Sequence, residues 1–202
     1  EAGLFESTGG RKAKAIAFNA VAKYAVGLDI TRNHVGIVII DLSGEVVHHV
    51  RHTYPFSNTR EYFAGVGRKV EQSIEASQVE RGKILGVGIA LPAILSDDKQ
   101  TVKYATVIDF QEGSAASFEE FIPYPCLLSN DANAAGFAEL WHEGDIQDMV
   151  YLSLNNSVGG AIVMGKNVYP GQNHRSGEFG HMTIVPGGRT CYCGQQGCVD
   201  AY

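Results

Sequence analysis

Charged residues, cysteines and long apolar runs are all scarce in this 202-residue chain. Only 19% of its residues are charged and 45% are hydrophobic, which excludes a disordered polyampholyte and indicates a globular core. Lys and Arg number 16 against 22 Asp and Glu, so this segment lacks the basic face of a nucleic-acid clamp. The longest aliphatic run, about Ile37–Ile40, is far shorter than the ~20 apolar residues of a membrane helix. No signal peptide opens the chain, so we expect a cytoplasmic protein with no membrane partner.

The first half of the chain predicts an α/β lobe. Three short apolar segments joined by tight polar turns, within residues 24–54, predict an antiparallel meander. Apolar residues then recur at spacings of three and four, which predicts a helix over residues 60–77. The apolar run at 84–91, ended by a proline, is typical of a central parallel strand.

The second half begins with a similar pattern. Residues 26–39 and 151–164 share a strand, a polar turn, glycine and a second strand in the same order. Such a repeat predicts two related α/β lobes with a ligand site between them. A second copy would need its own helix and further strands. We therefore expect a fragment, with residues 23–125 as the first lobe and 126–202 as the start of the second.

Three of the four cysteines, Cys191, Cys193 and Cys198, fall within eight residues of one another. Zn²⁺ takes four tetrahedral ligands, usually thiolates and imidazoles, and the nearest upstream candidate is His181. A Cys3His set leaves no open coordination position, so we predict a structural rather than a catalytic zinc site. Free thiols or a disulfide, with Cys126 as the fourth partner, are the alternatives. The Cys-x-Cys spacing makes a relaxed disulfide within the motif awkward.

Carboxylates flank these motifs. Glu178 lies three residues before His181, and Asp200 lies two residues after the cysteine loop (residues 191–198). Each could accept hydrogen bonds from the vicinal hydroxyls of a sugar-like ligand. The alternative is that both are solvated surface acids. Asn130 and Asp131 lie where an apolar strand meets an alanine-rich helix, which is typical of an N-cap. The same place is also where open α/β sheets bind ligands, so Asp131 could act there as a general base or an acceptor.

Together these features resemble the ROK family (repressors, open reading frames and sugar kinases). Its ASKHA-type α/β fold, shared with actin and hexokinase, has two duplicated lobes, of which the second would be incomplete here. The similar segments occur in the family's order: GIALP at 88–92, NDANA at 130–134, EFGH at 178–181 and CYCGQQGC at 191–198. The resemblance implies zinc at His181, Cys191, Cys193 and Cys198. It implies sugar contacts by Asn130, Asp131, Glu178 and His181. The resemblance implies a third acidic sugar ligand at Asp200, where the family usually has Glu.

Two departures favour the NagC/XylR-like regulators of the family over its kinases. The kinases follow the first strand's Asp with Gly-Gly-Thr, whose bare backbone lets phosphates approach closely. Here Asp29 is followed by Ile30 and Thr31, so side chains occupy the glycine places. The second phosphate turn, glycine-rich in kinases, reads NNSVGG at 155–160. We therefore expect a regulator and not an enzyme.

The N-terminal residues agree with the regulator branch. Residues 1–22, with a basic run at 7–14, resemble the end of the winged helix-turn-helix domain and the linker that precede the sugar lobe in ROK repressors. The resemblance implies a sugar-sensing effector domain of a repressor of sugar-utilisation genes. Its partners would be a sugar or sugar phosphate, DNA through a domain missing from this chain, and further copies in a homo-oligomer. The alternative is an ATP-dependent, glucokinase-like sugar kinase, with Mg-ATP as cofactor and Asp131 as its catalytic base.

Overall fold

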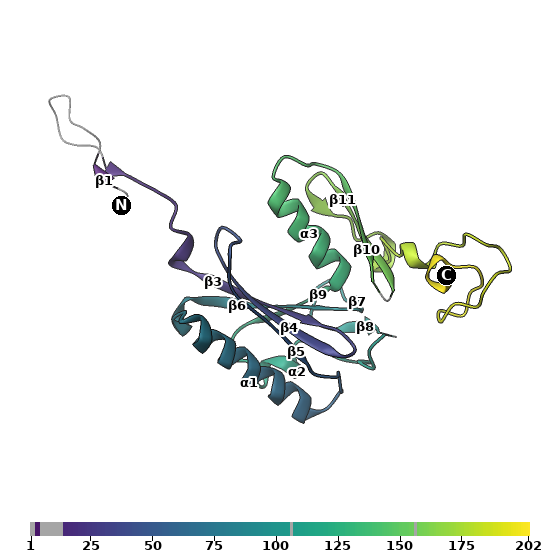
Figure 1. The fold of residues 1–202 in the computed structure, drawn as a ribbon, viewed down its shortest axis with the longest axis horizontal. Coiled ribbons are helices and arrows are strands. Elements are labelled where there is room, and N and C mark those ends of the chain that lie inside the picture. The colour runs from purple at the N-terminus through teal and green to yellow at the C-terminus, as the bar shows by residue number, and fades with distance from the viewer. Residues whose placement is uncertain (1–2, 5–13, 106, 156) are drawn as a thin grey trace.

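The computed structural model describes residues 3–4, 14–105, 107–155 and 157–202 (Figure 1). Two helices, α1 and α2, lie on one side of a central sheet, and a third, α3, lies on the other side between this sheet and a second, smaller one. The expectation of a basic linker at 7–14 falls almost entirely outside the described residues.

The central sheet has five strands in the order β5-β4-β3-β6-β9. They are β3 (Tyr24–Ile30), β4 (His34–Asp41), β5 (Val46–Thr53), β6 (Ile84–Leu91) and β9 (Cys126–Asn130). The first three pair antiparallel, whereas β6 runs parallel to both β3 and β9. The predicted meander and the predicted central parallel strand are both confirmed.

Helix α1 (Arg60–Ser77) begins where Thr59 accepts a hydrogen bond from the backbone N–H of Tyr62 at 3.3 Å, which satisfies one unpaired donor of the first turn. Its buried face is the one that the sequence pattern predicts, and it packs with the short helix α2 (Ala116–Glu119) against the sheet. The apolar residues of this face of α1 are Phe63, Val66, Val70 and Ile74. Among the helices that the structure describes, none is long and apolar enough to cross a bilayer.

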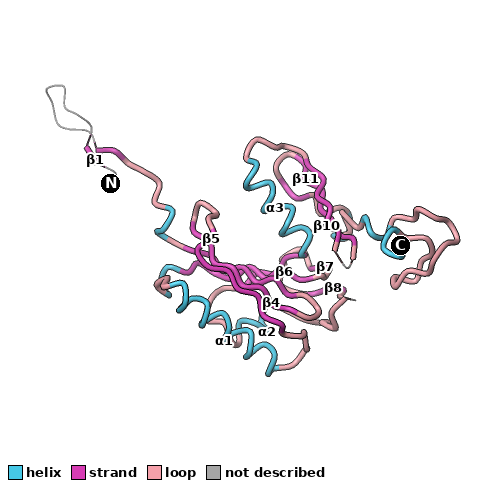
Figure 2. Tube along the Cα trace, viewed as in Figure 1, coloured by secondary structure: helices cyan, strands magenta, loops and turns pink. Residues whose placement is uncertain are grey.

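The second unit repeats the meander on a smaller scale (Figure 2). After α3 (Asp131–Glu143), three antiparallel strands form a sheet in the order β10-β11-β12. These strands are β10 (Met149–Leu154), β11 (Val158–Met164) and β12 (Asn167–Val168). Two small ladders complete the described strands: β1 (Gly3–Leu4) with β2 (Lys14–Ala15), and β7 (Ile94–Leu95) with β8 (Val102–Tyr104).

The sequence analysis placed the start of the second lobe at residue 126, which is the first residue of β9. Strand β9 pairs with β6 from Cys126 to Asn130 and is therefore the last strand of the first sheet. Helix α3 instead packs on the second sheet, so closely that a Cβ on Gly136 would lie 2.8 Å from Ala161 Cβ. We call the residues up to Asn130 the first unit and those from α3 onward the second unit. No linker marks the change, because strand and helix follow each other directly.

Candidate functional site

The end of β9 and the start of α3 place two of the predicted sugar ligands. Asn130 is the N-cap of α3: its Oδ1 accepts the backbone N–H of Asn133 at 3.0 Å, and its Nδ2 donates to the Ala93 carbonyl at 3.3 Å. Asp131 is the first residue of the helix, and its Oδ1 accepts the N–H of Ala132 at 2.9 Å. The N-cap interpretation is therefore confirmed for Asn130. It leaves open a ligand role for the neighbouring carboxylate.

Three carboxylates from different elements influence one another at this place. Desolvation by the surrounding protein raises the pKa of Asp131, and the nearby carboxylate of Asp29, at the end of β3, raises it further. Desolvation also raises the pKa of Glu178, with a smaller contribution from Asp131. Both Asp131 and Glu178 nevertheless remain accessible to solvent. Carboxylates that protein surrounds but solvent still reaches are typical of a polar ligand site.

Asp29 is a member of this group that the sequence did not single out as a ligand. It lies opposite Gly36 on β4, which in turn lies opposite Arg51 on β5. Desolvation raises the pKa of Asp29, and the charges of Arg51 and then His34 lower it. Only the pairing of three strands brings Asp29 and Arg51 into one row, so no local motif could have indicated that they lie near each other.

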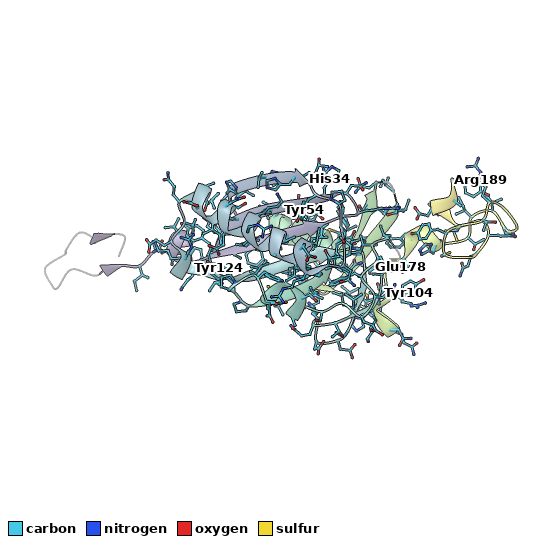
Figure 3. The ribbon with its side chains drawn as sticks, turned by 90° about the horizontal axis from the view of Figure 1, so that it is seen from below. His34, Tyr54, Tyr104, Tyr124, Glu178 and Arg189 are labelled. Atoms are coloured by element: carbon cyan, nitrogen blue, oxygen red, sulfur yellow. The ribbon has the colours of Figure 1, made fainter. Side chains whose placement is uncertain are left out.

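The turn that carries Glu178 lies directly against the backbone of β11. It is a single 3-10 turn, Phe179–His181, in the sequence Gly177-Glu178-Phe179-Gly180-His181 (Figure 3). Gly177 has a φ of +78°, and a Cβ there would lie 2.3 Å from the Gly160 carbonyl oxygen. A Cβ on Gly180 would lie 2.3 Å from the Val158 carbonyl oxygen. The two glycines therefore allow the close approach that fixes Glu178 and His181.

Gly180→Ala is expected to destabilise the protein by about 1–3 kcal/mol, as overpacking does, because the turn must move off β11. Urea unfolding measures the loss. The matched control is Gly82→Ala, where a Cβ would meet nothing within 4 Å. If both variants unfold at the same urea concentration, the packing of this turn on β11 is not as described.

The four predicted zinc ligands converge. Their ligand atoms all lie within 4.8 Å of one another. His181 Nδ1 lies 3.7 Å from Cys191 Sγ, and Cys193 Sγ lies 3.8 Å from Cys198 Sγ. Zn–S bonds of about 2.3 Å in a tetrahedron place two sulfurs about 3.8 Å apart. The donor set and its spacing therefore fit a closed, structural zinc site.

The alternative of a disulfide involving Cys126 does not fit this arrangement. None of the four cysteines, all of which the structure describes, is in a disulfide. Cys126 is buried in the core of the first sheet, and burial raises its pKa to about 12, so that thiol stays protonated. It takes no part in the cysteine loop.

Asp200 has a second role that the sequence did not reveal. Its Oδ1 accepts the backbone N–H of Val158, at the start of β11, at 2.7 Å. This bond ties the end of the cysteine loop to the second sheet across 42 positions of sequence. Its Oδ2 is buried without a hydrogen-bond partner among the described residues, as are Asn133 Oδ1 and Ser176 Oγ. Unpaired buried polar atoms next to the motifs point to a polar ligand or water there.

Some backbone N–H groups at the two turns that resemble kinase phosphate turns are engaged by the chain's own oxygens. In the first, the N–H of His34 donates to Thr31 Oγ1 at 3.0 Å, and the N–H of Thr31 donates to the His34 carbonyl at 3.0 Å. In the second, the N–H of Val158 is the one held by Asp200. Asn156 of that turn lies outside the described residues.

A contact between the two units was also not foreseen. His174 Nε2 lies 2.5 Å from Asp97 Oδ1, which Lys103 Nζ also approaches at 3.3 Å. The hydrogen bond with His174 makes the largest contribution to lowering the pKa of Asp97, and the bond with Lys103 lowers that pKa further. Asp97 lies between β7 and β8, and His174 lies four positions before Glu178. The segment that leads to Glu178 is therefore anchored to the first unit.

Known proteins are similar to this chain in both sequence and fold. The chain is 28% identical over 207 residues to a xylose repressor from Caldicellulosiruptor bescii, covering 100% of this chain and 52% of that protein. A ROK family glucokinase from Streptomyces griseus, whose structure holds glucose and AMPPNP, superposes with a TM-score of 0.73 at 26% identity, covering 87% of this chain and 55% of that one. A ROK family transcriptional regulator, a homologue of the E. coli MLC protein, superposes with a TM-score of 0.72 at 23% identity, covering 90% and 47%.

The chain thus spans about half the length of the proteins it matches, and its fold is the actin/hexokinase-like one that ROK kinases and regulators share. The two TM-scores are nearly equal, so the fold does not distinguish the kinases from the regulators. The family model described as "ROK family" matches residues 25–202. That match covers most of the chain, which therefore belongs to the ROK family.

Proposed function

We propose that this chain is the sugar-sensing part of a ROK transcriptional regulator that represses sugar-utilisation genes. The observation that carries the proposal is the contrast between its two kinds of site. The carboxylates of Asp131 and Glu178 remain accessible, whereas the N–H groups of His34 and Val158, at the two turns that resemble phosphate turns, already donate to side-chain oxygens of the chain. Such a chain can still bind hydroxyl groups while offering little to the phosphates of ATP.

The second turn is the stronger part of this contrast. In phosphate sites, backbone N–H groups bind the anion. Here the N–H of Val158 already donates to a carboxylate, and the negative charge of Asp200 repels a phosphate at the same place.

The sugar would bind between the two units. Asp131 and Glu178 would each accept hydrogen bonds from hydroxyls. Asn130 would donate the second N–H of its Nδ2, since Oδ1 caps α3 and the first N–H bonds to Ala93. A zinc ion would supply structural cross-linking of the cysteine loop and no chemistry. Nδ1 of His181 faces Cys191, and Nε2 lies 3.4 Å from the Tyr192 hydroxyl and 4.0 Å from Glu178 Oε2. Zinc ligation by His181 would therefore also fix the ring beside Glu178.

Ligand-dependent regulation requires two arrangements with different sugar affinities. The sugar would favour one arrangement of the two units and thereby change the affinity for DNA of a domain upstream of this chain. The repressor relative supports this branch. A homo-oligomeric full-length protein that binds DNA through the missing domain belongs to the same proposal.

A sugar kinase is the second candidate. The similarity to the Streptomyces griseus glucokinase favours it, as does the raised pKa of Asp131, which suits a general base that must accept a proton. In that case Asp131 would deprotonate the attacking hydroxyl, and Mg-ATP would supply the phosphoryl group.

We expect the full-length protein to bind a sugar without phosphorylating it. Calorimetry with xylose, glucose, glucose 6-phosphate, N-acetylglucosamine and its 6-phosphate measures binding. A coupled ADP-release assay with Mg-ATP measures turnover, with the Streptomyces griseus enzyme as a positive control. Turnover above ~1 s⁻¹, the lower end for kinases, would overturn the regulator proposal in favour of the kinase. Absence of binding to every sugar of the panel would contradict both.

A further inference from the structure

Helix α3 connects the candidate sugar site to a distant turn of the first unit. Asp131 is its first residue, and Trp141 lies ten positions later, about 15 Å along the axis at 1.5 Å per residue. The indole Nε1 of Trp141 donates to the Ser43 carbonyl at 3.3 Å, in the turn between β4 and β5. The ring also lies against Gly44, where a Cβ would come within 2.9 Å of Nε1.

The helix is held much more firmly by the second unit than by this turn. Gly136 lets α3 pack on the second sheet, since a Cβ there would lie 2.8 Å from Ala161 Cβ and 3.3 Å from Tyr151 Cβ. Figure 1 shows α3 lying along β10 and β11. Any rotation of the second unit therefore carries α3 with it and moves Trp141 relative to the first unit.

The turn that Trp141 contacts is itself bonded to the segment that leads into β3. The backbone N–H of Leu42 donates to the carbonyl of Ala20 at 3.0 Å. Just upstream, Ile16 and Phe18 are 92% and 73% exposed, so the chain before Ala20 has few apolar contacts of its own. A displacement of the β4–β5 turn is thus passed to the segment through which any upstream domain must be joined.

We propose that Trp141 is the joint through which the sugar site acts on the upstream segment. A sugar bound by Asn130 of the first unit and by Asp131 and Glu178 of the second would draw the two units together, and α3 would turn as a rigid lever. The contact of the indole with Ser43 and Gly44 would then shift the turn and, through Leu42, the segment at Ala20. This inference rests on the proposed regulator function and deepens it by naming the route of regulation.

The contact at Trp141 is suited to such a role because it is weak and exposed. It consists of one hydrogen bond and one face of an indole that is 57% accessible. A net hydrogen bond contributes about 0.5–1.5 kcal/mol, which a sugar's preference for one arrangement can outweigh. Coupling through the joint is measured by its response to ligand.

The first test uses Trp141 as its own probe, the only tryptophan in this chain. Full-length protein is titrated with each sugar of the panel above while tryptophan emission is recorded, and calorimetry is run in parallel. The emission is expected to change with the same midpoint as the heat signal, and Trp141→Phe is expected to remove that change while retaining sugar affinity within about 2-fold. Trp141 lies well away from the sugar site, so a merely local effect of binding would leave its emission unaltered.

The second test measures coupling to DNA in the full-length protein, with a DNA fragment from upstream of its own gene. Coupling free energies of 1–3 kcal/mol correspond to changes in affinity of about 5- to 150-fold. We expect the sugar to weaken DNA binding of the unmodified protein by about 10-fold and that of Trp141→Phe by less than about 3-fold. Tyr169→Phe, which changes another half-exposed aromatic residue, is the matched control and should behave as the unmodified protein.

The outcomes separate the two proposals. Sugar binding with no Trp141-dependent change in emission, or with full coupling retained in Trp141→Phe, overturns the inference and leaves the regulator proposal standing. Absence of sugar binding in the calorimeter overturns the regulator proposal and this inference with it.

Discussion

Protein purified under reducing conditions without chelator is expected to hold about one zinc per chain, and Cys193→Ala to hold none. The four ligand atoms within 4.8 Å form a closed set, and removal of one thiolate leaves only three ligands for an ion that needs four. Mass spectrometry of the metal content gives the stoichiometry. Metal binding in complete sites of this kind contributes about 10–16 kcal/mol, so the unmodified protein should keep its zinc through purification.

Cys126→Ala is the matched control, because it removes the one thiol that lies outside the loop. It should retain the full zinc content. A zinc content near zero in the unmodified protein, or equal losses in Cys126→Ala and Cys193→Ala, would refute the site.

Loss of zinc is also expected to open the cysteine loop to protease. The cysteine loop and the segment that leads into it contribute little to an apolar core, since Met182, Ile184 and Tyr192 are all more than half exposed. Arg189 lies on the outer part of this loop (Figure 3), so trypsin should cleave after it in chelated protein and much more slowly in the zinc-loaded form. Cleavage after Arg175, upstream of the loop, serves as the internal reference.

Asp131→Asn is expected to weaken sugar binding by about 10- to 100-fold and, at neutral pH, to raise the melting temperature. Hydrogen bonds to a charged group contribute about 1.5–3 kcal/mol, which sets the loss of affinity. The gain in stability arises because desolvation and the charge of Asp29 disfavour the ionised carboxylate in the folded protein. Asn keeps an oxygen for the N–H of Ala132. Each kcal/mol gained corresponds to about 2–4 °C in a protein of this size.

The pH dependence of that gain has a definite sign. The folded pKa of Asp131 lies above its ordinary value of 3.8, so the folded state binds more protons than the unfolded state between the two values. Stability of the unmodified protein therefore falls as pH rises through this window and stays lower above it. The advantage of Asp131→Asn should be full at neutral pH and vanish below pH 3.8. Calorimetric melting curves from acid to neutral pH follow it.

Glu139→Gln makes the same chemical change at an exposed position on the same helix. It should alter stability by no more than about 0.5 kcal/mol and leave sugar affinity unchanged. If Asp131→Asn lowers the melting temperature at neutral pH, or binds sugar as well as Glu139→Gln does, then Asp131 has neither the environment nor the role assigned to it.

Local patterns predicted those features whose causes are local. The buried face of α1 follows from apolar residues one turn apart, and the N-cap at Asn130 from the junction of β9 with α3. The convergence of the candidate zinc ligands could be predicted because Cys191, Cys193 and Cys198 share one short loop, so that their spacing already restricts their geometry. The pairing of β9 with β6 was not indicated, because strand β9 runs into α3 without a linker residue between them.

The sequence by itself determined the family, the meander of each unit and the set of candidate ligands, because each of these depends on residues that are close together in the sequence. Only the tertiary structure decided which groups meet. The pairing of β3 with β4, and of β4 with β5, puts Asp29 in line with Arg51. Asp200 accepts the N–H of Val158, 42 positions earlier, and the packing of α3 brings Trp141 to Ser43, 98 positions away. Such contacts depend on strand order and on the closeness of packing. Neither leaves a periodic or local trace in the sequence.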